Sequence, residues 1–180
     1  MWSLIQRETE EFKDYNMEAF VKFENGIFNV YNQSTGNSIG KVKIDLKAPF
    51  IQSEIHIDDK KYLLTRNQWE TTVSDGDEVI YQLKTNSISG NTEIQELNKK
   101  IKGVWGLKWG TQLTDETGKT LLRIRNEKKS VDNGNYIIKL EQENLNPLEI
   151  LIALYGHLYG SSLKKTGVLL GIVAGSPGMH

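Results

Sequence analysis

The chain has 180 residues, 22 basic against 23 acidic side chains, and no cysteine. A chain of this length can bury roughly 70% of the surface that it exposes when unfolded, so residues 1–180 are expected to form one domain without covalent staples. The missing cysteines exclude disulfides, thiol catalysis and cysteine-ligated zinc. The net charge of −1 argues against nucleic-acid binding, because nucleic-acid binders usually carry a clear basic excess.

The N-terminal residues do not have the pattern of a secretory leader. Residues 1–7 are followed at once by Glu8, Glu10 and Glu11, where a leader would have an apolar stretch. Together with the absence of cysteine, this predicts a cytoplasmic protein, either free or peripheral at the membrane.

Most of the chain has the pattern of short β-strands joined by tight turns. The clearest hairpin has Asn25-Gly26 between two apolar runs, and both residues tolerate the positive φ that such a turn needs. Residues 39–46 alternate between apolar and lysine or aspartate positions, the pattern of a strand with one face toward a core. Similar runs predict about twelve strands: 3–7, 19–23, 27–31, 39–46, 53–57, 61–66, 69–73, 78–84, 92–97 and 99–102 (two short strands or one bent one), 104–113, 119–125 and 135–141.

One segment near the end of the chain predicts a helix instead. Asn146 suits the N-cap, Pro147 the first helical position and Glu149 the first turn. The apolar residues of 147–159 point in every direction around the axis, so this helix must be buried on all sides. Residues 148–159 of this helix span roughly 18 Å, too short to cross a bilayer core of about 30 Å, so no transmembrane segment is expected.

The helix and the strands account for each other. A closed sheet of about twelve strands has room for one helix, whereas an eight-stranded barrel is filled by its own side chains. The sequence therefore predicts a mainly β fold, a closed antiparallel barrel of about twelve strands around the helix 147–159. The tail 160–180 is left open: it could cover the mouth of the barrel, or dock on a partner or a membrane.

Three stretches resemble the tubby-like superfamily, which comprises tubby C-terminal domains, plant LURP-one-related proteins and phospholipid scramblases. They are the strand Trp105-Gly106-Leu107-Lys108-Trp109, the segment 115–122 and the helix 147–159. The resemblance implies a twelve-stranded antiparallel barrel around a hydrophobic C-terminal helix. Tubby domains hold phosphoinositide headgroups in a basic pocket, but no residue set of that kind is matched here, and the cysteine-rich region expected near scramblases is missing.

The best candidate site is a basic group near residue 125. Arg123 and Arg125 occupy alternate positions of one predicted strand and so share a face, and Lys128 and Lys129 follow in the adjoining loop. Four positive charges could therefore attract an anionic lipid surface. The plainer interpretation is that basic residues on outward faces keep the barrel soluble and unaggregated. The same alternatives apply to three further groups: Lys41, Lys43, Lys47; Lys99, Lys100, Lys102; and Lys164, Lys165.

Metal and catalytic chemistry find little support in the sequence. His56, Asp58 and Asp59 fall at a predicted hairpin whose turn explains the aspartates, and residues 75–78 lack the remaining ligands of a calcium loop. His157 is interpreted as a histidine of the core or the barrel mouth. No nucleophile triad, phosphate loop or paired-carboxylate motif is present, so no metal, no cofactor and no enzymatic activity are expected.

Two functional hypotheses remain. The first is a non-enzymatic binding or regulatory module that engages anionic phospholipid headgroups or a protein partner. The second is a lipocalin-like barrel that carries a small apolar ligand. Whether the helix fills the barrel decides between them, because a filled lumen leaves no room for a carried ligand.

Overall fold

The computed structural model describes residues 17–45, 50–103, 110–128 and 131–174, with the backbone alone for 131 and 163–174. The predicted strand 3–7 and residues 104–109 of the predicted strand 104–113 lie outside these ranges. The described elements are twelve strands, one short 3₁₀ helix and one α-helix: β1 (Met17–Glu24), β2 (Ile27–Asn32), β3 (Ser38–Ile44), β4 (Gln52–Ile57), β5 (Lys60–Asn67), β6 (Glu70–Asp75), β7 (Glu78–Thr85), β8 (Thr92–Ile94), η1 (Gln95–Leu97), β9 (Lys99–Lys102), β10 (Thr111–Thr114), β11 (Thr120–Lys128), β12 (Val131–Leu140) and α1 (Pro147–Ala174).

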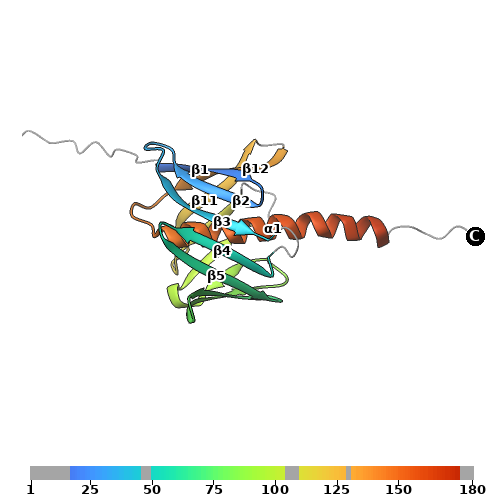
Figure 1. Cartoon of the computed structure of the whole chain (residues 1–180). Helices are drawn as coiled ribbons and strands as arrows, with labels where there is room; N and C mark the ends of the chain where they lie inside the picture. Colours follow the sequence, from blue (N-terminus) through green and yellow to red (C-terminus); the bar gives the residue numbers. More distant parts are fainter. Residues whose placement is uncertain (1–16, 46–49, 104–109, 129–130, 175–180) are drawn as a thin grey trace, which may run out of the picture.

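The strands form one closed antiparallel barrel. Each strand pairs with its neighbour in sequence, and β1 pairs with β12 in the register Val21↔Tyr136 to close the sheet. Closure removes both sheet edges, which would otherwise expose unpaired backbone groups. The predicted fold, a closed antiparallel barrel of about twelve strands with a helix, is confirmed, and Figure 1 shows the strands around α1.

Alternation along each strand separates the core from the outer surface. In β3, Gly40, Val42 and Ile44 are buried while Lys41 and Lys43 are not. Gly40 lies close to both β4 and the helix: a Cβ added there would be 2.6 Å from the carbonyl oxygen of His56 and 2.7 Å from Leu151 Cδ1. Glycine therefore lets β3 lie directly against α1.

The helix begins as the sequence predicts and fills the barrel. The Asn146 side chain accepts a hydrogen bond from the backbone N–H of Leu148 at 2.9 Å, as an N-cap should. Leu151, Ile152, Ala153 and Leu154 are adjacent in sequence and all fully buried, so every side of the helix meets the sheet. The inner faces of the strands supply the rest of the core.

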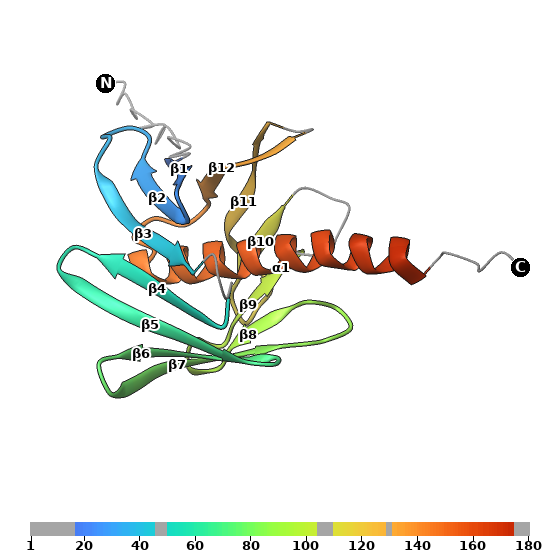
Figure 2. The same cartoon turned by 45° about the vertical axis from the view of Figure 1, so that its right-hand side comes forward.

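The end of the helix was predicted wrongly. The sequence predicted a helix over 147–159 and left 160–180 open, but α1 runs on to Ala174. Glycine and serine at 160–162 do not end it, because one interior glycine costs only about 1 kcal/mol and Pro177 comes later. Residues 161–174 leave the barrel and project from it (Figures 1 and 2).

The two ends of the barrel are therefore different. We call the end where α1 begins the N-cap end and the end where it leaves the exit end. Because neighbouring strands are antiparallel, odd-numbered strands end and even-numbered strands begin at the exit end. At the exit, the ring of Phe50 lies 5.5 Å from the ring of Tyr159, and the Arg66 guanidinium lies 3.3 Å over that same Tyr159 ring.

Leu151→Asp is expected to prevent folding. An unpaired charge at this fully buried position would cost several kcal/mol, a large part of the roughly 5–15 kcal/mol by which a domain of this kind is stable. Far-UV circular dichroism and urea unfolding would measure the loss. Val79→Asp is the matched control because Val79 is half exposed on β7, and it should fold like the wild type. A Leu151→Asp protein that stays soluble and unfolds cooperatively would contradict a helix-filled barrel.

Candidate functional site

The structure brings the predicted arginines together and adds two lysines to them. Ile124 is buried between Arg123 and Arg125, so both arginines lie on the outer surface of β11. The register places Lys102 beside Gln112, Gln112 beside Arg123, and Arg123 beside Lys139. Basic side chains thus form a row across β9 to β12, broken by one glutamine.

We call this surface, made of Lys102, Arg123, Arg125, Lys128 and Lys139, the basic face. The predicted member Lys129 lies outside the described residues. Lys128 is the last residue of β11, so the basic face reaches the exit end of the barrel. The sequence did not point to Lys139, and it grouped Lys102 with other lysines, because strand register cannot be read from spacing alone.

Carboxylates partly neutralise the basic face: Glu141 contacts two of its cations, Glu127 precedes Lys128 in sequence, and the register places Glu18 of β1 beside Lys139. Arg123 Nε donates a hydrogen bond to Glu141 Oε1 at 3.1 Å, and Lys139 Nζ lies 3.8 Å from the same oxygen. Two cations therefore share one carboxylate. Arg125 makes no ion pair with any of the described residues. The basic face keeps a positive surplus and guanidinium donors that an anion can reach.

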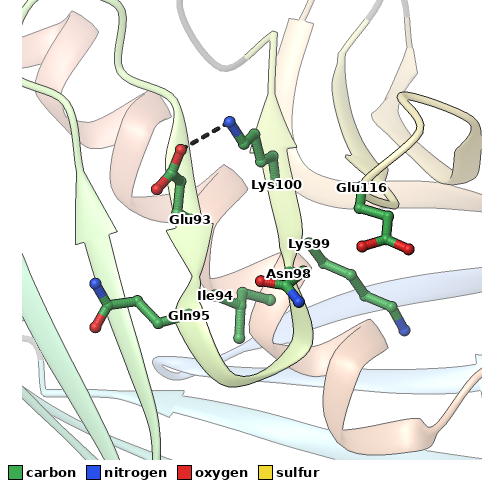
Figure 3. Close-up of a pocket in the computed structure, with 7 residues that line it drawn as sticks. All are labelled: Glu93, Ile94, Gln95, Asn98, Lys99, Lys100 and Glu116. Atoms are coloured by element: carbon green, nitrogen blue, oxygen red, sulfur yellow. Dashed lines mark ion pairs between the residues drawn. The ribbon is translucent and has the colours of Figure 1, made fainter.

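Alternation along β9 places Lys99 on the inner side of the sheet with buried Ile101, and it places Lys100 and Lys102 on the outer side. Lys102 belongs to the basic face, whereas Lys100 pairs with Glu93 on β8 at 2.8 Å. That pair borders a surface depression of about 410 Å³ at the N-cap end, lined by Glu93, Ile94, Gln95, Asn98, Lys99, Lys100 and Glu116 (Figure 3). The lining mixes both signs of charge, so it does not select an anion as the basic face does.

Lys99 serves the helix instead of a ligand. Its Nζ forms an ion pair with the carboxylate of Glu149 in the first turn of α1, and both side chains are largely buried. Burial raises the pKa of nearby Tyr81, and the negative charge of Glu149 raises it further. The pair fixes the start of the helix to β9 at the N-cap end.

A second depression, of about 430 Å³, lies across the Glu93–Lys100 pair toward the exit end. Its lining includes Trp69, the Lys84–Glu70 pair at 3.6 Å, and polar side chains of the connection from β7 to β8. The sequence pattern alone did not point to Trp69, Glu70 or Lys84. Trp69 was the one feature that could have indicated this site, but nothing in the sequence pattern placed another residue beside it.

His56 and Asp58, which were considered as metal ligands, have other roles. His56 Nε2 lies 2.9 Å from Glu54 Oε2. That hydrogen bond, helped by the charges of Lys43 and Lys61, holds the pKa of Glu54 below its usual value. Asp58 takes a positive φ in the β4–β5 turn. Among the described residues, no three histidine, aspartate or glutamate side chains are gathered as a metal site requires.

His157 is a core residue near the exit end. Its Nδ1 lies 2.7 Å from the Thr111 hydroxyl on β10, and its ring meets that of Tyr136 edge to face at 4.8 Å. These contacts attach α1 to β10 and β12. The prediction of a core or barrel-mouth histidine agrees with this position.

The chain folds as a closed antiparallel barrel around a central helix. A crystal structure of the Arabidopsis thaliana protein AT5G01750 is similar, with a TM-score of 0.55 over 81% of this chain and 93% of the other, at 13% identity. At that identity the likeness concerns the fold. No protein-family description matches the sequence, and no curated protein matches it. The described part of the chain contains no helix that is both long enough and apolar enough to cross a membrane.

Removing Lys99 alone should destabilise the protein more than removing both members of its ion pair. Lys99→Met would leave Glu149 as a buried unpaired carboxylate, and we expect a loss of about 3 kcal/mol in the free energy of unfolding. Lys99→Met/Glu149→Leu should recover most of that loss. Urea denaturation of the wild type, both single variants and the double variant forms the cycle. A double variant that loses the sum of the two single losses would show that the residues act independently.

Proposed function

We propose that the protein is a non-enzymatic binding module of the tubby-like type, which engages anionic phospholipid headgroups through its basic face. In this proposal it is a cytoplasmic protein that is peripheral at the membrane. The observation that carries the proposal is the row of Lys102, Arg123 and Lys139 on β9, β11 and β12, with Gln112 of β10 between the first two. Arg125 and Lys128 extend it toward the exit end.

The chemistry of the basic face suits a phosphate. A guanidinium offers parallel N–H donors that match two phosphate oxygens, and lysines beside it add charge without fixing geometry. Glu141 is shared by two cations, so an incoming phosphate could replace it on Arg123 while Lys139 retains it. The chain as a whole is close to neutral, so attraction to anionic surfaces has to come from such a local cluster.

The filled lumen supports a binding module over a carrier of apolar ligands. Side chains of α1 from Leu148 to Leu158 occupy the interior that a lipocalin-like carrier would keep open. An acidic protein partner could use the basic face as well, and it is the second candidate. Binding to vesicles that contain no protein would favour anionic headgroups over an acidic protein partner.

Charge reversal at Arg123 and Arg125 should weaken binding to anionic vesicles about thirtyfold or more. Each basic side chain near an anionic membrane contributes about 1 kcal/mol, and the double reversal removes two of them. Cosedimentation with vesicles of phosphatidylcholine and phosphatidylserine (7:3) at 50 mM salt would measure it. Lys41→Glu/Lys43→Glu is the matched control, because these lysines occupy the same alternate outer positions on β3.

Two further results complete this test. Wild-type binding should weaken as salt rises, because the Debye length falls from roughly 10 Å at 0.1 M to about 3 Å at 1 M. The free energy of unfolding of every variant should stay within about 1 kcal/mol of the wild-type value, since exposed ion pairs contribute little. If the wild type ignores anionic vesicles at low salt, or if the β3 control loses as much binding as the β11 variant, the headgroup proposal fails.

A further inference from the structure

Exposed apolar side chains gather at the exit end. Five large hydrophobic residues are exposed among the described ones, and four of them lie at this end: Phe23 (41% exposed), Ile51 (61%), Trp69 (38%) and Ile88 (87%). They come from four successive hairpins, β1–β2 to β7–β8. The fifth, Val79, is at the N-cap end. We call the four residues the apolar rim.

Hydrogen bonds within the β7–β8 connection hold Ile88 in an exposed position. The Asn86 side chain accepts hydrogen bonds from the backbone N–H groups of Ile88 and Ser89, both at 2.9 Å. Two backbone hydrogen bonds then close the loop, from Asn86 N–H to the carbonyl of Asn91 and from Gly90 N–H to that of Asn86, both at 2.8 Å. Residues 86–91 contain no charge. An uncharged, internally bonded loop can hold an isoleucine outward and enter an apolar phase without further ordering.

Trp69, one of the four residues of the apolar rim, lies where the rim meets a charged surface. Trp69 borders the second depression, and the Lys84–Glu70 and Lys100–Glu93 pairs follow it away from the exit end. Apolar side chains are thus followed by a tryptophan and then by ion pairs. Groups are met in the same order on leaving a bilayer, where tryptophan favours the headgroup level.

The projecting part of α1 has a similar order along its length. Residues 161–174 extend for about 21 Å, with Lys164 and Lys165 near the barrel and a run from Val168 to Ala174 without charge at the far end. That run covers about 10 Å, less than half of a hydrocarbon core of about 30 Å. The chain has no acidic residue after Glu149. Two lysines between the barrel and an apolar tip suit an anionic headgroup layer.

The geometry points to insertion of the exit end into one leaflet of a lipid bilayer, with the apolar rim and the tip of α1 in the interface. The fully buried core of a protein–protein interface is one apolar patch, whereas the rim residues stand on four separate hairpins. Lipid can surround each tip independently. This inference goes beyond headgroup binding, since it depends on apolar contacts that remain when the lipid is zwitterionic.

Because the chain has no cysteine, a single introduced cysteine can report the environment of Ile88. Ile88→Cys carrying a polarity-sensitive fluorophore should shift to the blue on mixing with phosphatidylcholine vesicles, and lipids with a quencher on the acyl chain should quench it. Val79→Cys at the N-cap end, with the same label, should do neither. In parallel, unlabelled Ile88→Ser should partition about tenfold more weakly than the wild type into phosphatidylcholine vesicles.

The outcomes separate this inference from headgroup binding. Insertion is overturned if labelled residue 88 stays unshifted and unquenched while the protein sediments with anionic vesicles, a result that leaves headgroup binding intact. It is also overturned if the protein ignores both vesicle types, or if Ile88→Ser changes the oligomeric state of the vesicle-free protein, which would assign the rim to contact between copies. Selective quenching at residue 88, retained in Arg123→Glu/Arg125→Glu, supports insertion even where headgroup selectivity is lost.

Discussion

The structure depends on burying a helix that has no polar side. Leu151, Ile152, Ala153 and Leu154 face four directions, so a flat sheet could cover only part of them. A sheet that closes on itself covers all of them and also pairs its own edges through β1 and β12. Gly40 on β3 permits the close approach, and the Lys99–Glu149 pair fixes the start of the helix. The helix and the barrel therefore depend on each other to fold.

This constraint decides where binding can occur. With the interior occupied by the chain itself, ligands are left with the outer surface and the two ends. The outer surface is basic across β9 to β12, where Arg123 lies between Gln112 and Lys139. The exit end carries the four exposed residues of the apolar rim on the hairpins from β1 to β8, and Lys128 of the basic face lies at the same end. Basic and apolar surfaces that meet at one end allow both proposals to describe one orientation on a membrane.

Local signals in the sequence were sufficient for the fold but not for the site. The Asn25-Gly26 turn, the alternation of β3 and the Asn146 cap are each set by neighbours in sequence, and each was predictable. The end of α1 was not, because glycine and serine at 160–162 weaken a helix without ending it. The basic face depends on register between strands, and one lysine group proved to contain Lys99 directed to Glu149 and Lys102 beside Gln112. The exposure of Ile88 depends on hydrogen bonds to Asn86, whose geometry only the folded loop provides.

Native-state hydrogen exchange of the vesicle-free protein tests the helix-filled barrel most directly. If α1 can leave the lumen only when the sheet opens, the backbone amides of Ile150 to Leu158 should exchange through global unfolding, with the same opening free energy as the buried amides of β4 and β5. Amides beyond residue 161 should exchange much faster. Exchange of Ile150 to Leu158 at the rates of a fraying surface helix, while the strands stay protected, would contradict the account.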